Sequence, residues 1–335
     1  MENGFFLDFP LFIKWNITGR CNLRCRHCFL SSYSAEPDLN VVGDLISLFR
    51  ERKVVSVILT GGEPLLRPDI ADIVGMLSRA SIRAILATNG TLLTDGLVRS
   101  LADNGLKQCQ VSLDGHDEAS HERIRGAGTF KKALDGLASL KKAGIRAILG
   151  HTLNSQNAAH ALDVARLAAA AGADTLRYEL FLPIRDGGDS GLNFNVADVV
   201  RLKKDLLGLR KKAGGLSIVL PCAINPAGGV SDASVGCGAG TTTCVINSDL
   251  SLSPCDLLCE KERTVRMRGP VEFAALWRED SVFGKWRDIS VPDGVCAACS
   301  ERKRCGFGCR AAALSYTGDF SARDPLCLLA GKGEQ

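Results

Sequence analysis

Residues Cys21 to Cys28 have the sequence C-N-L-R-C-R-H-C, which sets three cysteines in a C-x3-C-x2-C arrangement. The apolar stretch before them, Leu11 to Ile17, predicts a first β-strand. Three thiolates can hold three irons of a four-iron cluster, which leaves the fourth iron open to an outside ligand. A zinc site is the alternative, with His27 as fourth ligand, although His27 stands between two of the thiols. The triplet therefore indicates a cluster with a reactive iron.

A second motif follows a second apolar run. The run extends from Val54 to Leu59, and the chain then reads Gly61-Gly62-Glu63-Pro64. Two glycines let the backbone approach a ligand closely, and the carboxylate of Glu63 can bind an ammonium group. Gly-Pro-rich turns are common, so this motif gains its weight from the cysteine triplet that precedes it.

Together the two motifs resemble those of the radical SAM superfamily, in which an aromatic residue, here Phe29, follows the triplet. The resemblance implies that the triplet holds a [4Fe-4S] cluster that binds S-adenosylmethionine (SAM). It also implies that the second motif binds the SAM amino group. The cluster ligands would be Cys21, Cys25 and Cys28, and the amino-group site would be Gly61, Gly62 and Glu63.

Further candidate SAM contacts follow the third and fourth strand-like segments. Asn89 lies in Thr88-Asn89-Gly90, and Ser112-Leu113-Asp114-Gly115 resembles the segment whose serine and aspartate contact the SAM ribose in related enzymes. Ser112 and Asp114 are also ordinary turn residues, which is the alternative for both. Arg125 could pair with the SAM carboxylate, because a guanidinium binds a carboxylate bidentately, or it could lie on the surface.

The first half of the chain alternates strand and helix patterns. Helical periodicity separates the strand-like runs, as in Ile70 to Ala80 and Phe130 to Ala143, and Thr94 is a plausible N-cap. Spacing alone also allows a doubly wound sheet. The resemblance implies an α/β fold with a partial (β/α)6 TIM-like barrel, whose sites lie at the carboxyl ends of the strands. The six runs begin near Leu11, Val54, Arg83, Gln108, Ile145 and Thr175, and three helices end at Gly105, Gly144 and Gly172.

A cysteine-rich segment follows, with nine of the fourteen cysteines between Cys237 and Cys327. Eight of them resemble the SPASM extension, an iron-sulfur domain that binds two auxiliary [4Fe-4S] clusters. Zinc knuckles are the alternative, because C-x2-C spacing does not by itself distinguish zinc from iron and sulfide. We expect a short lead at 1–10, the partial barrel at 11–220 and the SPASM domain at 221–335. The resemblance assigns Cys237, Cys244, Cys255 and Cys309 to one auxiliary cluster, and Cys296, Cys299, Cys305 and Cys327 to the other.

Three cysteines and one aspartate are not among the assigned cluster ligands and are considered separately. We expect Cys109 to be a small buried hydrophobe, and Cys222 has no assignment. Cys259 is a spare thiol, a replacement ligand or a hydrogen-atom donor. Asp256, in Ser253-Pro254-Cys255-Asp256, has the position of the base in anaerobic sulfatase-maturating enzymes, which the chain resembles here, although it could equally cap a turn.

Composition narrows the class of protein. The 335 residues include 46% hydrophobic residues, and the net charge of +4 is spread over mixed-sign stretches. A nucleic-acid partner is therefore not expected. We see no apolar run long enough for a membrane span and no signal peptide, so we expect a cytoplasmic protein. Fourteen cysteines in a cytoplasmic chain of this size indicate metal rather than disulfides.

The resemblance implies a radical SAM/SPASM oxidoreductase or maturase with SAM and three [4Fe-4S] clusters. It would cleave SAM to a 5′-deoxyadenosyl radical, take a hydrogen atom from the substrate and oxidise it by dehydrogenation or crosslinking. The expected substrate is a ribosomally made peptide or protein, and the electron donor is of the flavodoxin or ferredoxin type. The alternative is a dehydrogenase, epimerase or decarboxylase acting on a small sugar or aminocyclitol in natural-product biosynthesis. An iron-sulfur electron carrier is a non-enzymatic possibility.

Overall fold

The computed structural model describes residues 6–29, 35–184, 191–212, 215–221, 237–259, 263–289 and 294–327. Cys222 lies outside these ranges. The described strands form one ten-stranded sheet in the order β10-β9-β8-β1-β2-β3-β4-β5-β6-β7. The strands are β1 Phe12–Thr18, β2 Ser56–Gly61, β3 Arg83–Thr88, β4 Gln108–Ser112, β5 Arg146–Leu153, β6 Thr175–Leu180, β7 Ser217–Val219, β8 Thr243–Ile246, β9 Ser251–Ser253 and β10 Val265–Arg266.

Helices alternate with the first six strands, as expected for parallel neighbours joined by crossovers. The strands β1 to β7 pair in parallel, whereas β9 is antiparallel to both β8 and β10. The helices are α1 Leu39–Glu51, α2 Ile70–Arg79, α3 Asp95–Asp103, α4 Glu118–Arg125, α5 Phe130–Lys142, α6 Ala161–Ala170, α7 Val196–Lys212, α8 Phe273–Glu279, α9 Ser281–Arg287, α10 Gly294–Ala298, α11 Arg302–Cys305 and α12 Arg310–Thr317.

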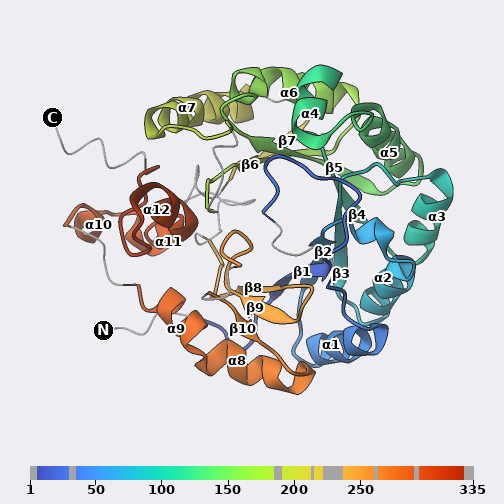
Figure 1. Cartoon of the computed structure of the whole chain (residues 1–335), viewed down its shortest axis with the longest axis horizontal. Helices are drawn as coiled ribbons and strands as arrows, with labels where there is room; N and C mark the ends of the chain where they lie inside the picture. Colours follow the sequence, from blue (N-terminus) through green and yellow to red (C-terminus); the bar gives the residue numbers. More distant parts are fainter. Residues whose placement is uncertain are drawn as a thin grey trace.

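The sheet curves without closing, and α1 to α6 surround its outer face (Figure 1). The helices α10 to α12 lie on the side away from α2 to α5. The expected α/β fold with a partial barrel is confirmed. Since β8 pairs in parallel with β1, the sheet continues across the expected boundary at residue 220, and the division into domains stays a prediction.

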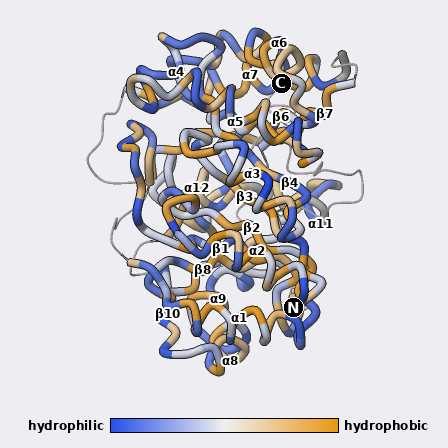
Figure 2. The backbone as a smooth tube through the Cα atoms, turned by 90° about the vertical axis from the view of Figure 1, so that its right-hand side faces the viewer, coloured by the Kyte–Doolittle hydropathy of each residue, from blue (hydrophilic) through white to orange (hydrophobic). Residues whose placement is uncertain are grey.

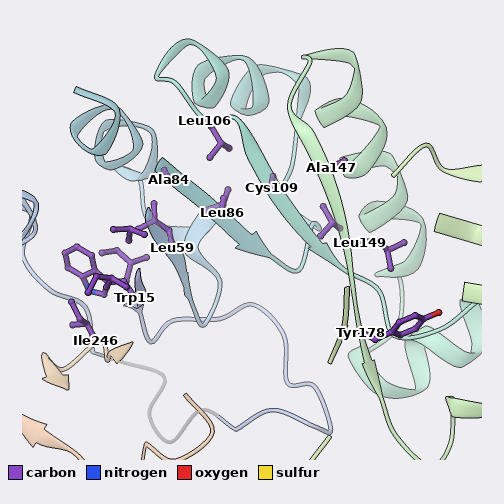
Figure 3. Close-up of a cluster of buried hydrophobic side chains, with 14 of the residues drawn as sticks. Trp15, Leu59, Ala84, Leu86, Leu106, Cys109, Ala147, Leu149, Tyr178 and Ile246 are labelled. Carbon is purple, nitrogen blue, oxygen red and sulfur yellow. The ribbon is translucent and has the colours of Figure 1, made fainter. Parts of the chain in front are cut away.

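The main core lies between the strands and the outer helices. Trp15, Leu59, Leu86 and Leu149, on β1, β2, β3 and β5, are fully buried (Figure 3). Cys109 on β4 belongs to the same cluster, which confirms it as a small buried hydrophobe. In Figure 2 the tube changes between orange and blue within single helices, as expected where only one helix face contacts the sheet.

The other face of β1 carries polar side chains toward the inside of the barrel. Along β1 the residues alternate between the buried Ile13, Trp15 and Ile17 and the more polar Lys14 and Asn16. A strand places successive side chains on opposite faces, so Lys14 and Asn16 share the inner face. The inner face of β1 is therefore polar, and the isoleucines 58 and 85 continue its row across β2 and β3.

Helix ends follow the expected local chemistry. The hydroxyl of Thr94 accepts a hydrogen bond from Leu97 N at 3.3 Å, which confirms it as the N-cap of α3. Gly105, Gly144 and Gly172 have φ values of +95°, +70° and +72°, a conformation that glycine adopts without strain. In the described part of the chain, no helix is both long and apolar enough to cross a membrane.

Candidate active site

The three N-terminal cysteines lie in the loop that leaves β1, and all three are half-buried. Cys28 N donates to the carbonyl of Cys25 at 3.0 Å, and Leu23 N donates to Sγ of Cys21 at 3.4 Å. Burial raises the pKa of Cys25 to about 11, although Arg125 opposes this effect. A metal ligand must be a thiolate, so metal binding here would release protons.

The Gly61-Gly62 turn packs directly against this loop. Gly62 N donates to Thr18 O at 2.8 Å, and Glu63 N donates to Arg20 O at 2.7 Å. A Cβ on Gly62 would lie 2.5 Å from the carbonyl carbon of Arg20. Gly61 has a φ of +129°, which other residues rarely adopt. The two glycines thus allow close contact with the chain's own backbone, and their contact with SAM stays a prediction.

The carboxylate of Glu63 is fully buried and accepts three hydrogen bonds from the protein. Oε1 accepts from Leu65 N at 3.0 Å and from Thr88 Oγ1 at 2.6 Å, and Oε2 accepts from Asn89 N at 2.8 Å. Burial raises its pKa, while these donors oppose the effect. One acceptor position on Oε2 is left for an ammonium group. Glu63 therefore also fixes the end of β3.

Asn89 joins the end of β3 to the cysteine loop. Its Nδ2 donates to Asn22 Oδ1 at 2.9 Å, and its Oδ1 accepts from Thr91 N at 2.9 Å. Asn22 Nδ2 in turn donates to Thr91 Oγ1 at 2.9 Å. Sequence reasoning missed Asn22 and Thr91, although Asn22 lies within the cysteine motif. The amide of Asn89 is thus engaged in positioning the loop.

Ser112, at the end of β4, is half-buried. Among the described residues its hydroxyl has no hydrogen-bond partner, so it can accept from or donate to a ligand.

Asp114 and Arg125 form a buried ion pair beneath the cysteine loop. Arg125 Nε donates to Asp114 Oδ2 at 2.5 Å, and Thr152 N donates to Oδ1 at 2.7 Å. Burial would raise the pKa of Asp114, but Arg125 and His27 outweigh it and hold the pKa below its usual range. Arg125 Nη1 also lies 4.0 Å from Sγ of Cys25. The pair therefore connects the Ser112-to-Gly115 segment to a candidate cluster ligand.

Two histidines bind the backbone of the Ser112-to-Gly115 segment, and sequence reasoning missed both. Asp114 N donates to Nδ1 of His121 at 3.1 Å, and Nδ1 of His151 lies 2.8 Å from Leu113 O. Both imidazoles are fully buried. Burial lowers the pKa of His121 to about 4, so this ring is neutral near pH 7. Asp114 is fully buried within this network, and its predicted contact with the SAM ribose stays a prediction.

Asp256 lies beyond β9 and forms an ion pair with Lys14 on the inner face of β1. Burial would raise the pKa of Asp256, but Lys14 outweighs it and holds the pKa below the usual value. Glu179 on β6 belongs to the same group of charges: it raises the pKa of Lys14, and burial together with Asp256 raises the pKa of Glu179 itself. Sequence reasoning missed Lys14, whose only signal is a charged residue inside an apolar strand. The structure thus places an ionised carboxylate on the inside of the barrel.

The C-terminal cysteines fall into two groups along the fold. Cys244 is buried on β8, and Cys255 follows β9. The other group lies in or beside α10, α11 and α12, where Asp324 Oδ2 accepts from Cys309 N at 2.8 Å. Cys296 and Cys327 both raise the pKa of Cys305, after burial, which indicates that these thiols are near one another. The first group also includes Cys237 and Cys259, and the second comprises Cys296, Cys299, Cys305, Cys309 and Cys327.

The spacing of the thiols argues against mononuclear zinc. Two thiolates on one tetrahedral zinc ion lie roughly 3.8 Å apart. Among the described residues, only His116, His160 and Asp163 form a group of three or more ligand atoms within 4.8 Å of one another. Those two imidazoles are stacked at an interplanar angle of 19°, so their lone pairs do not converge on one ion. The described cysteines thus form no group of three with the close spacing that a mononuclear zinc site needs.

Comparison with known proteins agrees with this arrangement. Residues 15–168 match the Radical SAM superfamily. The AdoMet-dependent heme synthase of Methanosarcina barkeri is 31% identical over 95% of this chain and 96% of its own length. Mycofactocin maturase MftC of Mycobacterium tuberculosis is 28% identical over 96% of this chain and 84% of its length. The crystal structure of Streptococcus suis SuiB bound to precursor peptide SuiA shares the fold, with a TM-score of 0.80, 18% identity and coverage of 96% of this chain and 77% of that chain.

The partial barrel and its cysteine loop define an iron-sulfur enzyme of the radical type. This chain belongs to the radical SAM superfamily. Within the superfamily it is an enzyme of the SPASM type, with SAM and a [4Fe-4S] cluster as cofactors.

Proposed function

We propose that this chain oxidises a carbon atom of its substrate, using SAM bound to a cluster on Cys21, Cys25 and Cys28. One observation supports this most: the cysteine loop, the Gly61-Gly62 turn and the ends of β3 and β4 are joined by direct contacts into one rim. When bound, the cluster and SAM supply a 5′-deoxyadenosyl radical that removes a hydrogen atom from carbon. The rim would orient SAM over the inside of the barrel.

The rim residues would divide the binding of SAM among them. The remaining acceptor position of Glu63 and the adjacent backbone would bind the amino group, and the hydroxyl of Ser112 would bind the ribose. Arg125 has donors beyond those facing Asp114 and Cys25, and these would bind the SAM carboxylate. Asn89 and Asp114 would act by positioning the loops, since protein partners occupy both side chains.

Asp256 would remove the proton that leaves when the substrate is oxidised. Its Oδ2 atom faces Lys14, which keeps the carboxylate ionised and able to accept a proton from a carbon-bound hydroxyl, thiol or amine. The same ion pair makes Asp256 a weaker base than a free aspartate. Lys14 therefore sets the pH range in which Asp256 can act.

Two auxiliary [4Fe-4S] clusters would complete the enzyme and accept the electron that the substrate loses. One would use Cys237, Cys244, Cys255 and a fourth thiol, which the family pattern places at Cys309. The other would use Cys296, Cys299, Cys305 and Cys327. The barrel would span 11–220 and the auxiliary domain 221–335. A flavodoxin- or ferredoxin-type protein of the cytoplasm would supply the reducing electron.

We propose a ribosomally made peptide or protein as the substrate. The 28% identity to mycofactocin maturase extends over 96% of this chain, and SuiB holds its precursor peptide in the same fold. A second candidate is a small molecule, for which the relationship to AdoMet-dependent heme synthase favours a tetrapyrrole over the sugar or aminocyclitol expected from the sequence. That relative has the higher identity, and nearly its whole length is matched.

Formation of 5′-deoxyadenosine distinguishes the two substrate classes. Reduced, reconstituted protein would be given host extract that ultrafiltration has divided into macromolecular and small-molecule fractions. Stimulation by the retained fraction, abolished by protease, supports a peptide or protein. Stimulation by the filtrate alone contradicts a peptide or protein substrate and favours the small molecule.

An Asp256→Asn variant tests the role of Asp256 as the base. With normal iron content it should still form 5′-deoxyadenosine but little oxidised product. An unchanged amount of oxidised product would exclude Asp256 as the base.

A further inference from the structure

We propose that Lys203 of α7 is the positive counter-charge of the second auxiliary [4Fe-4S] cluster and raises the reduction potential of that cluster. The inference rests on the cluster proposed above for Cys296, Cys299, Cys305 and Cys327. It goes further by naming a residue of a barrel helix, outside the cysteine-rich segment, that determines how readily this cluster accepts an electron.

Lys203 occupies a core position on α7. Val199, Leu202 and Leu206 of the same helix are buried, and helical spacing places residues 199, 203 and 206 on one face. Only 1% of Lys203 is exposed, so its ammonium group does not reach solvent along its flexible stem. A fully buried lysine is rare unless a negative charge lies beside it. The position therefore calls for a negative partner.

The ammonium group of Lys203 touches the segment that carries the candidate ligands. Nζ donates to the carbonyl of Leu326, the residue directly before Cys327. In the described part of the chain this carbonyl is its one hydrogen-bond acceptor, and Lys203 forms no ion pair there. An ammonium carries three donors, so two of them are left for another acceptor. In Figure 1, α7 lies on the same side of the barrel as α10 to α12, which agrees with this contact.

Asp324 is the buried carboxylate of this region, and the backbone occupies both of its oxygens. Oδ2 accepts from Cys309 N at 2.8 Å, and Oδ1 accepts from Leu326 N at 2.9 Å. Cys327 N in turn donates to the carbonyl of Asp324 at 3.1 Å. Burial lowers the pKa of Lys203, and Asp324 opposes this effect without forming an ion pair with it. Asp324 thus holds the ligand segment together and compensates the lysine only in part.

Arg310 is a second buried cation beside the same carboxylate. Its Nη1 donates to Phe320 O at 3.0 Å and to Ala322 O at 2.8 Å, whereas its Nε is buried without a partner. From α7 onward, the fully buried charged side chains of the described residues are Lys203, Arg310 and Asp324. Two cations and one carboxylate leave one positive charge, and a buried charge needs compensation. A [4Fe-4S] cluster with four thiolates carries a charge of roughly −2 when oxidised, so it fits this site.

Redox titration of the auxiliary clusters tests the assignment. The three cysteines of the N-terminal triplet are first replaced by alanine, so that only auxiliary clusters are reduced. Lys203→Met, Lys203→Arg and, as a matched control, Lys204→Met are then added singly. Lys204 is the next residue of the same helix and is exposed. Electron paramagnetic resonance during anaerobic reduction gives the midpoint potential of each cluster, while iron analysis and far-ultraviolet circular dichroism verify loading and folding. Cys299→Ala identifies the signal of the second cluster.

We expect Lys203→Met to lower the equilibrium constant for reduction of the second cluster by about tenfold or more, and each factor of ten is about 59 mV toward negative potential. Reduction adds negative charge, which the lysine no longer compensates. The first auxiliary cluster should keep its potential, as should both clusters in Lys203→Arg and Lys204→Met. An unshifted second cluster in Lys203→Met with full iron, or an equal shift in Lys204→Met, would overturn the proposal. Absence of auxiliary iron in the parent would instead contradict the auxiliary clusters themselves.

Lys203→Gln decides the case in which Lys203→Met does not assemble the second cluster. Glutamine keeps a donor for Leu326 O but carries no charge. A negative shift in Lys203→Gln, or loss of the second cluster from both neutral variants while Lys203→Arg keeps it, supports the counter-charge. A loaded Lys203→Gln with the parent's potential would show that the hydrogen bond alone is needed. Loss of the cluster from all three variants would assign Lys203 a packing role, and either of these results overturns the proposal.

Discussion

Gly62 has no room for a side chain, because the backbone of Arg20 crosses directly over its Cα. Here the residue type follows from packing within the protein, before any ligand is considered. The same holds for Glu63 and Asn89, whose polar atoms bind neighbouring loops. Residues of the SAM motifs thus build the rim as well as being candidates for binding SAM.

Gly62→Ala should weaken both the fold and the cysteine loop. The added methyl group forces the turn and the loop apart, at a cost of about 1–3 kcal/mol in the free energy of unfolding. Urea denaturation and iron content of the anaerobically prepared protein measure the two effects. Gly43→Ala in α1 is the matched control, because nothing lies within 4 Å of its Cβ position, and it should stabilise by about 0.5–1 kcal/mol. Equal stability of the two variants would refute the close approach.

Asp114→Asn should be strongly destabilising. It leaves the guanidinium of Arg125 buried without its counter-charge, which typically costs about 3–5 kcal/mol. Asp135→Asn breaks the exposed pair with Lys131 and should change stability by less than about 1 kcal/mol. Urea midpoints at pH 7 compare the two variants, and similar values would contradict a buried pair.

The difference in stability between wild type and Asp114→Asn should depend on pH, because the Asp114 carboxylate titrates. Its folded-state pKa lies below the ordinary value of 3.8, so the unfolded chain takes up the proton first as the pH falls. The stabilisation is complete above the ordinary value and is lost as the pH falls toward the lower, folded-state pKa. The gap between wild type and Asp114→Asn should therefore narrow only below about pH 4.

At the level of strands and helices, the sequence predicted most of the barrel. Helix starts at Ile70 and Phe130 and strand starts at Arg83, Gln108 and Thr175 agree with the structure. These elements follow from local periodicity and turn chemistry, which a sequence displays directly. The first two strands begin at Phe12 and Ser56, one and two residues later than expected, as is usual for element ends.

The missed parts depend on contacts between distant segments. Lys14 and Asp256 are 242 residues apart, and their pairing requires β8 to lie beside β1. The partner of Asp114 was missed because Arg125 had been considered only for SAM or the surface. The histidines 121 and 151 gave no signal, since each binds a backbone group of the β4 loop. Such networks follow from topology rather than from local pattern.

The ion pair between Lys14 on β1 and Asp256 after β9 predicts how product formation depends on pH. Lys14→Met removes the cation that keeps Asp256 ionised, and burial then raises the pKa of Asp256. The acid side of the pH profile for product formation should shift to higher pH, by about one unit or more. Lys14→Arg should restore the original profile because it keeps the charge. If the acid side of the pH profile is unchanged in Lys14→Met, with normal iron content, Lys14 does not control the ionisation of the group that limits product formation.

Across the whole molecule, the segment after the barrel is built into the same sheet. Trp277 Nε1 donates to Leu7 O at 2.8 Å, and Ser315 Oγ donates to Pro183 O at 3.2 Å. Lys203 of α7 is buried and donates to Leu326 O, next to the candidate ligand Cys327. The last two bonds connect the second group of C-terminal cysteines to the barrel, and the pairing of β8 with β1 connects the first group.

The most direct test of the central claim is the cleavage of SAM by the reduced protein. We expect the reconstituted chain to convert SAM to 5′-deoxyadenosine and methionine in equal amounts after reduction by dithionite. The Cys25→Ala variant should keep auxiliary iron yet form none, because the loop then lacks one thiolate of the triplet. Cys109→Ala should behave as wild type, since Cys109 is packed in the apolar core. A wild-type protein that carries its full iron but forms no 5′-deoxyadenosine, with or without substrate fractions, would contradict radical SAM chemistry in this chain.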